Sequence, residues 1–261
     1  MIYYKILNYH LHRLPCIVMV HGFTHNHQYF SAQIPVFREQ YRLLLVDLRG
    51  HGLSKNIPGP YGVEEYADDI LQVMDATGIK EAHYWGTHTG AAIGLVLALR
   101  QPERFISMIL EGTFLPGFSM PRAGELIERA RKIAAQDGIQ AALQDWYTHA
   151  DWFEGIRRHP QLCRAEEHQA MTMQFSGMPW LSSDAPRAVT PVAAHLQEIA
   201  IPTLVYNGDS DLPDFKNAAG YLHQHLPSEK QQIIPETGGF PAWENPTPVN
   251  SLVMHFLQEQ Y

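Results

Sequence analysis

Short runs of apolar residues recur along the chain, separated by segments whose apolar residues have helical spacing. Short apolar runs that turn residues bound on both sides are typical of strands buried within a sheet. Such runs predict strands at residues 16–20, 41–46, 81–85, 105–110, 201–207 and 231–234.

The segments between the first strands predict helices. Residues 63–77 carry apolar side chains on one helical face, and Gly78 ends that pattern. Residues 90–100 predict a buried helix, and residues 31–39 have a turn-like, amphipathic character. Strands that alternate with helices and are apolar on both faces favour a parallel sheet covered on both sides. The sequence therefore predicts an α/β fold.

Residues 116–190 interrupt this alternation. They have helical patterns at 123–135, 140–147 and 160–175, no strand-like run, and many large apolar side chains: Trp146, Trp152, Phe153, Met171, Met173, Met178 and Trp180. One interpretation is a helical insertion with an ordinary core. The other is a lid, because aromatic residues line ligand pockets at domain interfaces. We predict a core of residues 1–115 and 191–261 and a helical lid of residues 116–190, two or three of whose large side chains line a pocket.

Composition and charge narrow the class of protein. The 261 residues are 45% hydrophobic and 18% charged, as in ordinary globular proteins, and the formal charge of -8 argues against nucleic-acid binding. The two cysteines, Cys16 and Cys163, indicate neither a disulfide framework nor a thiolate zinc site. The apolar runs are too short to span a membrane, and no signal peptide is visible. We expect a cytoplasmic protein that acts on a small molecule, without nucleic acid or membrane as a partner.

Histidine is the unusual residue, with fifteen copies. Three pairs are spaced by one residue: His10/His12, His25/His27 and His223/His225. Carboxylate ligands at matching spacing are not evident, so we predict no metal site. Neither GxGxxG nor GxxxxGK[ST] occurs, so no nucleotide or flavin cofactor is expected.

Several motifs follow one another in a fixed order. They are His21-Gly-Phe23, Asp47-Leu-Arg-Gly-His-Gly-Leu-Ser54, Gly86-Thr-His-Thr-Gly90, Gly208-Asp-Ser-Asp211 and Phe240-Pro-Ala-Trp-Glu-Asn-Pro246. Their order and spacing resemble the α/β-hydrolase fold superfamily over nearly the whole chain. The resemblance implies a mostly parallel sheet flanked by helices, with a helical lid.

The segment from Gly86 to Gly90 resembles the nucleophile elbow of that superfamily, a sharp strand-to-helix turn that requires small neighbours. The small residues here are Gly86, Gly90, Ala91, Ala92 and Gly94. At the centre stands His88, where the superfamily has Ser, Cys or Asp. At a helix N-terminus the helix dipole favours a neutral imidazole at pH 7.

The resemblance also implies an oxyanion hole and an acid. The backbone N–H groups of Phe23 and Thr89 match the two oxyanion donors. Asp211 takes the position of the acid, with Asp209 and Asp214 as further candidates. Some branches place the acid after the preceding strand, where Glu111 lies.

The catalytic histidine of the superfamily is missing. Its loop reads Gly-His-Phe-Pro, whereas this chain reads Gly238-Gly-Phe-Pro241, and no histidine occurs between His225 and His255. A Ser–His–Asp mechanism therefore cannot be assigned. We expect His88 to act with Glu111 or Asp211 as its orienting carboxylate. A His88 in apolar packing without a titratable neighbour would weaken an enzymatic role.

Two branches of the superfamily are similar to this chain. One is the 3-oxoadipate enol-lactonase-like branch. The other is the cofactor-independent 3-hydroxy-4-oxoquinoline 2,4-dioxygenases, which His21-Gly-Phe-Thr-His-Asn-His27 and Leu115-Pro-Gly-Phe118 resemble. The catalytic base of those dioxygenases stands where this chain has Gly239, so their mechanism does not transfer directly.

Three functions remain open. The first, which we predict, is cofactor-independent proton abstraction or carbonyl chemistry on a small substrate such as an N-heteroaromatic compound. The second is hydrolysis of an ester or lactone through His88. The third is ligand binding without catalysis.

Other residues complete the predicted site. Phe23, Thr89, His25 and Trp180 are candidate substrate contacts. His25 or His27 either faces the pocket and replaces the lost base, or is solvated or caps the next helix. His21 and His51 are expected to be hydrogen-bonded scaffolding.

Overall fold

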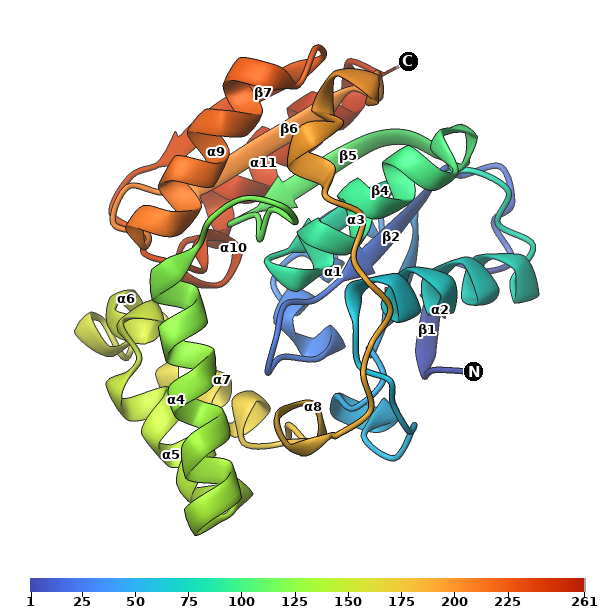
Figure 1. The fold of residues 1–261 in the computed structure, drawn as a ribbon. Coiled ribbons are helices and arrows are strands. Elements are labelled where there is room, and N and C mark those ends of the chain that lie inside the picture. Colours follow the sequence, from blue (N-terminus) through green and yellow to red (C-terminus); the bar gives the residue numbers. More distant parts are fainter. Residues whose placement is uncertain (261) are drawn as a thin grey trace.

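A seven-stranded sheet runs through the centre of the molecule, with the strand order β1-β3-β2-β4-β5-β6-β7 (Figure 1). The computed structural model describes residues 1–260. The strands are β1 (Tyr4–Leu7), β2 (Cys16–Val20), β3 (Arg42–Val46), β4 (Ala82–Thr87), β5 (Phe105–Glu111), β6 (Thr203–Gly208) and β7 (Glu229–Ile234). β1 pairs with β3 in antiparallel fashion, and all other pairs are parallel.

The structure confirms the six predicted strands and adds β1. β2 matches residue for residue, and every side chain of β2 and β4 is buried. β1 was missed because it lies at the edge of the sheet, spans four residues and has no alternation of buried and exposed side chains. The prediction of an α/β fold with a mostly parallel sheet is therefore confirmed.

Helices cover both faces of the sheet. One face carries α2 (Val63–Ala76), α3 (Thr89–Arg100) and α9 (Pro213–His225) (Figure 1). The other face carries α1 (Ile34–Phe37) and α11 (Pro246–Gln258), preceded by α10 (Pro241–Glu244). The Gln33 amide joins these segments, because it donates to the Ala242 carbonyl at 2.9 Å and to Asn250 Oδ1 at 3.2 Å. The α3 helix is buried on nearly all sides, as expected for residues 90–100.

The segment predicted as a lid, residues 116–190, is helical without strands. It contains α4 (Pro121–Asp137), α5 (Ile139–His149), the 3-10 helix η4 (Asp151–Phe153), α6 (Glu154–Arg158), α7 (Ala165–Thr172) and α8 (Met178–Leu181). These helices gather on one side of the molecule, and an extended segment returns from α8 past α3 to β6 (Figure 1). The domain boundaries themselves stay a prediction.

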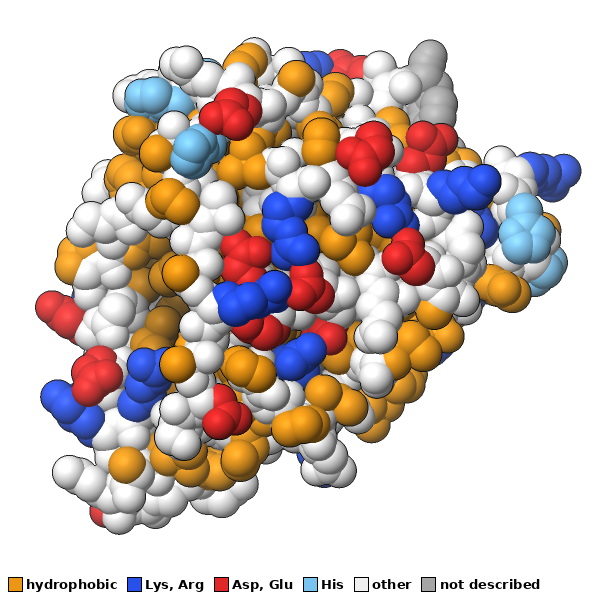
Figure 2. All heavy atoms as spheres, turned by 45° about the vertical axis from the view of Figure 1, so that its right-hand side comes forward, with side chains coloured by type: hydrophobic (Ala, Val, Ile, Leu, Met, Phe, Trp, Pro, Cys, Tyr) orange, Lys and Arg blue, Asp and Glu red, His pale blue; other side chains and the backbone are white. Residues whose placement is uncertain are grey.

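Ion pairs fasten the returning segment to the core. Arg187 bonds Glu65 at 2.9 Å and Asp68 at 2.6 Å, while Arg100 bonds Glu64 and Asp68 from the other side. Acidic and basic side chains are mixed on the face shown in Figure 2, with no extended region of one sign. Within residues 1–260, no helix combines the length and apolarity needed to span a membrane.

A close approach of two backbone segments lies at the start of α3. A Cβ atom on Gly90 would lie 2.2 Å from the Val20 carbonyl oxygen and 2.9 Å from that of His21. A Cβ on Gly86 would lie 2.4 Å from the Gly90 carbonyl oxygen. Glycine therefore lets the turn between β4 and α3 press against β2, as the sequence predicts for this segment.

Gly90→Ala is expected to lower the free energy of unfolding by about 3 kcal/mol or more, because backbone atoms on both sides cannot yield. Gly220→Ala in α9 is the matched control, since a Cβ there meets no atom within 4 Å. It is expected to stabilise the protein by about 0.5–1 kcal/mol. Urea unfolding measures both, and a Gly90→Ala protein as stable as the parent would contradict the packing argument.

Candidate active site

His88 occupies the turn between β4 and α3 in a strained backbone conformation. Its φ of 50° and ψ of -105° fall outside the regions that non-glycine residues ordinarily adopt. Its backbone N–H donates to the Glu111 carbonyl at 2.8 Å, and its carbonyl accepts from Ala92. The turn therefore has the geometry expected of a nucleophile elbow with histidine at its centre, and strain of this kind marks functional sites.

The imidazole ring of His88 is enclosed by aromatic rings. Its centroid lies 4.9 Å from that of Phe240, 5.3 Å from Phe215 and 5.4 Å from Trp152. The side chain is buried, and neither Nδ1 nor Nε2 has a hydrogen-bond partner among the described residues. The ring is thus in apolar packing, and no titratable side chain of the described residues is bonded to it, which is the arrangement that weakens an enzymatic role for His88.

Two glycines make room for the ring at its nitrogen atoms. A Cβ on Gly22 would lie 3.3 Å from Nδ1, and a Cβ on Gly112 would lie 2.8 Å from Nε2. Gly112 also has a positive φ of 50°, which a larger residue adopts at a cost. In this structure the imidazole therefore lies with Nε2 turned toward the backbone of residue 112.

Burial makes His88 a neutral group. Loss of solvation lowers the pKa of His88 to about 3, and the nearby backbone of Gly239 opposes this shift in smaller measure. The neutral ring that the sequence predicts is present, but the dominant cause is burial in an apolar cage.

Glu111 does not reach His88, so the dyad expected from the sequence is not formed with this residue. Its carboxylate accepts from the Tyr29 hydroxyl at 2.5 Å and from the Ala242 N–H at 2.8 Å. Burial raises the pKa of Glu111 to about 7, although these hydrogen bonds oppose the shift. Glu111 thus ties the end of β5 to α10.

Asp211 is also turned to other partners. It accepts from Asn207 Nδ2 at 2.8 Å and from the Leu212 N–H at 2.7 Å. Burial raises the pKa of Asp211 to about 7, against these two hydrogen bonds. The residue has the position of a triad acid, but no imidazole is bonded to it. Of the further acid candidates, Asp209 accepts from the Glu236 N–H, and Asp214 accepts from the Ala123 N–H.

The two expected oxyanion donors flank the elbow. Thr89 is the first residue of α3, so its N–H has no acceptor one turn earlier in the helix. Neither the Thr89 N–H nor the Phe23 N–H is bonded in the turns and loops of residues 1–260. Phe23 also lines the cavity beside His88. Their role in stabilising an oxyanion stays a prediction.

Trp152 fills the space that the missing histidine would need. A Cβ on Gly239 would lie 2.7 Å from Trp152 Cδ1 and 3.2 Å from its Nε1. The indole is 6% exposed, and its N–H has no hydrogen-bond partner within the described part of the chain. A lid residue thus replaces the side chain of a core loop. The sequence places Trp152 among the large lid side chains but gives no sign of this position.

The cavity beside His88 is nearly closed. It measures about 10 Å³, room for about one water molecule, and is lined by Phe23, His88, Trp146, Trp152, Phe153 and Phe240. The lid holds it shut through the Trp146 indole, which donates to Thr24 Oγ1 at 3.2 Å, and through Arg164, which lies 4.0 Å over the Trp243 ring. Any substrate must displace lid side chains to reach His88.

His25 is neither solvated nor a helix cap, and it does not line that cavity. It is buried, stacks on Tyr29, and meets the ring of His168 from α7 at 4.8 Å. All four ring nitrogens of His25 and His168 lack hydrogen bonds within residues 1–260. The helix cap that follows is supplied by Asn26. His168 was not singled out from the sequence, because its contact with His25 joins segments far apart in the chain.

The remaining predicted residues are hydrogen-bonded or packed at places away from the cavity beside His88. His21 accepts from the Leu48 N–H at 3.0 Å, and His51 Nδ1 lies 3.0 Å from the Arg49 carbonyl, so both are hydrogen-bonded scaffolding as expected. His27 Nδ1 lies 2.8 Å from Asp47. Trp180 packs against Phe23 and Phe175 but does not line the cavity beside His88. No group of three metal-ligating side chains forms within residues 1–260.

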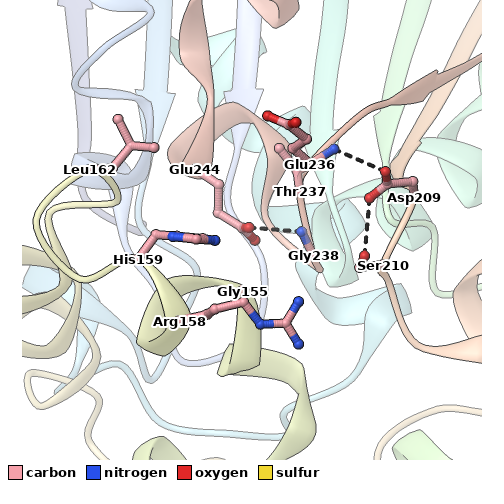
Figure 3. Close-up of a pocket in the computed structure, with 10 residues that line it drawn as sticks. All are labelled: Gly155, Arg158, His159, Leu162, Asp209, Ser210, Glu236, Thr237, Gly238 and Glu244. Atoms are coloured by element: carbon pink, nitrogen blue, oxygen red, sulfur yellow. Dashed lines mark hydrogen bonds between the residues drawn. The ribbon is translucent and has the colours of Figure 1, made fainter.

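A larger polar pocket opens on the other side of the loop before Gly239. It measures about 440 Å³ and is lined by residues of α6 and the segment after it, the turn after β6, the loop after β7 and α10: Gly155, Arg158, His159, Leu162, Asp209, Ser210, Glu236, Thr237, Gly238 and Glu244 (Figure 3). The Glu244 carboxylate accepts from the N–H groups of Gly238 and Phe240, at 2.7 and 2.9 Å. These bonds fix the loop backbone, and neither His88 nor Asp211 lines this pocket.

Comparison with known proteins agrees with this geometry. A family model described as the alpha/beta hydrolase fold matches residues 15–246, so the chain belongs to that family. A 3-oxoadipate enol-lactonase of Acinetobacter baylyi is 26% identical over 224 residues, covering 84% of this chain and 80% of the relative. Relatives of this kind support an enzyme of the α/β-hydrolase fold, with hydrolysis the favoured class of reaction.

Solved structures show the same fold. The enol-lactonase of Burkholderia xenovorans has a TM-score of 0.82 at 22% identity, covering 98% of this chain and 96% of that one. A thermophilic esterase of Thermogutta terrifontis has a TM-score of 0.81 at 21% identity, covering 99% of this chain and 93% of that one. At these identities the likeness concerns the fold alone.

His168→Phe is expected to make the protein less sensitive to acid. Burial lowers the pKa of His168 to about 3, so between pH 6.5 and 3 the unfolded chain binds a proton that the folded chain does not. This stability is present above pH 6.5 and is lost as the pH falls. Between pH 8 and pH 5.5, the free energy of unfolding of His168→Phe should fall by about 1 kcal/mol less than that of the parent.

Urea unfolding at pH 8 and pH 5.5 measures this difference. At pH 8 the variant should also be at least as stable as the parent, because two unsatisfied nitrogens are removed. His10→Phe, a matched change at an exposed position, controls for the loss of an imidazole as such. If the parent and His168→Phe lose the same free energy of unfolding between pH 8 and pH 5.5, the lowered pKa of His168 is refuted.

Proposed function

We propose that this protein hydrolyses small activated carboxylic esters or lactones, with His88 as the nucleophile. One observation carries the proposal: a buried, neutral imidazole with no side chain bonded to either nitrogen stands at the elbow, beside two backbone donors. Hydrolysis is the reaction in the names of the relatives described above. The imidazole is the one titratable side chain that lines the cavity.

The chemistry follows from the neutral ring. When the lid opens, the imidazole turns from Gly112 toward the cavity, and its unprotonated nitrogen attacks the substrate carbonyl carbon. The N–H groups of Phe23 and Thr89 stabilise the tetrahedral oxyanion. The bond to the leaving oxygen then breaks to give an acyl-imidazolium, water attacks its carbonyl carbon, the neutral imidazole leaves, and one proton of that water passes to the solvent. The low pKa of His88 keeps the attacking nitrogen unprotonated and makes the imidazole a good leaving group in the last step.

The cage also favours a planar substrate. Phe23, Phe153 and Phe240 line the cavity with rings, and the pocket has little volume until lid side chains move. A flat, unsaturated or aromatic compound would stack between these rings with the smallest displacement of the lid side chains.

The second candidate is the oxygen-dependent ring cleavage of a hydroxylated N-heteroaromatic compound, which the same aromatic cage would suit. That reaction begins with removal of a substrate proton. The pKa of His88, about 3, makes the ring a weak base for this purpose. The names of the relatives support hydrolysis, so hydrolysis is the better-supported reaction.

His88→Gln is expected to reduce the cleavage of p-nitrophenyl acetate to the rate in buffer, because the attacking nitrogen is lost. A serine-directed fluorophosphonate should leave the parent protein unlabelled and active. His149→Gln, at an exposed position on α5, is the control and should keep the parental rate.

Equal rates for the parent and His88→Gln would refute the nucleophile. Tight binding of a planar lactone without turnover, unchanged in His88→Ala, would instead favour a binding protein. Oxygen uptake with hydroxyquinolones, lost in His88→Gln, would favour the second candidate.

The rate of His88-dependent cleavage should not change between pH 5 and pH 8. Because the pKa of His88 is about 3, the imidazole stays unprotonated throughout this range. Measuring kcat/KM with p-nitrophenyl acetate, corrected for the reaction in buffer, tests this expectation. A fall of activity centred near pH 6.5, the pKa of an ordinary histidine, would show that the working imidazole is not the buried one.

A further inference from the structure

We infer that Trp152 is the hydrogen-bond donor to the leaving-group oxygen, and that the substrates are therefore esters or lactones of enols and phenols. The inference rests on the proposed hydrolysis and adds to it a residue from the lid and a class of leaving group.

The position of Trp152 is the first argument. The pyrrole edge of its indole lies in the side-chain space of residue 239, 2.7 Å from the Cβ that a larger residue would place there. In the superfamily that the sequence resembles, this is the place of the histidine that protonates the leaving group. The Trp152 ring meets the His88 ring edge to face at 5.4 Å, so the two side chains border the same cavity.

The unsatisfied N–H group is the second argument. Trp152 is 6% exposed, and its Nε1 has no acceptor within residues 1–260. A buried donor without a partner is costly, and an acceptor on a bound molecule would remove that cost. Trp146 lines the same cavity but already donates to Thr24 Oγ1 at 3.2 Å. Of the two indoles there, Trp152 is the one left to bind substrate.

The chemistry of indole then limits the substrate. The indole N–H can donate a hydrogen bond but does not give up its proton near neutral pH. The single N–H of the neutral His88 ring lies on the nitrogen remote from the one that attacks the carbonyl carbon, so it does not reach the leaving oxygen. The leaving oxygen must therefore depart as an anion, held by the Trp152 N–H, and take its proton from water afterwards. Enolates and phenolates are stable enough to leave as anions, whereas the alkoxide of a simple alcohol is not.

The test compares Trp152→Phe with the parent over a series of aryl acetates whose phenols span pKa values of about 5 to 10. Trp152→Phe keeps an aromatic ring and removes the donor. We expect kcat/KM to fall about tenfold or more for the poorest leaving groups and little for the best, so the plot of log kcat/KM against leaving-group pKa becomes steeper. Ethyl acetate should not be cleaved by either protein.

Trp146→Phe is the matched control. It also removes an indole N–H from the cavity wall, but that N–H is already satisfied by Thr24. It should change the rates for all esters by a similar factor and leave the slope unaltered. An unchanged slope in Trp152→Phe, with cleavage still dependent on His88, would overturn the role of Trp152. Loss of the dependence on His88 would instead overturn the proposed function.

A second measurement does not need a folded Trp152 variant. In the parent protein with ¹⁵N-labelled tryptophan, p-nitrophenolate should move one indole N–H resonance downfield, as expected when that N–H donates to an anion. The resonance is assigned by its absence in Trp152→Phe or, if that protein does not fold, by elimination with the other four tryptophans. Saturating p-nitrophenolate with no shift of any indole N–H would overturn the inference.

Discussion

The contact between the start of α3 and β2 is the constraint on which the site depends. Gly90 places its backbone against the Val20 carbonyl at a distance that no side chain would permit. This forces the chain from β4 into α3 within one residue, so that His88 takes a positive φ and stands between the backbones of residues 22 and 112. The oxyanion donors, the ring and the loop after β5 are all positioned by that single close approach.

Beside this elbow, aromatic packing occupies the place of the histidine that a catalytic triad would have at residue 239. Where an imidazole would link the elbow to the acid, an indole from the lid fills the space beside Gly239. The two carboxylates nearby are then bound by hydroxyl, amide and backbone donors. Removing one group has therefore separated the nucleophile position from the acid position. Hydrogen bonds hold the acid position and aromatic packing holds the nucleophile position, and no hydrogen bond joins the two side chains.

Burial then sets the ionisation of the whole region. His25, His88 and His168 surround Phe240, and burial lowers the pKa of each, while it raises the pKa of Glu111 and Asp211. Near neutral pH the histidines are uncharged, so the aromatic cage holds little charge. In such a medium, backbone N–H groups interact more strongly with a developing oxyanion than they would in water. The closed lid is the physical source of this medium.

The sequence by itself determined the sheet from β2 to β7, the elbow with His88, the absence of histidine at residue 239 and the helical character of the lid, because these are local in the chain. It could not determine β1, which is too short to show a pattern, or the partners of Glu111 and Asp211. Tertiary structure alone decided that Trp152 fills the space of residue 239 and that His168 meets His25. These contacts join segments tens of residues apart, and packing between the lid and the core selects them; spacing along the chain does not.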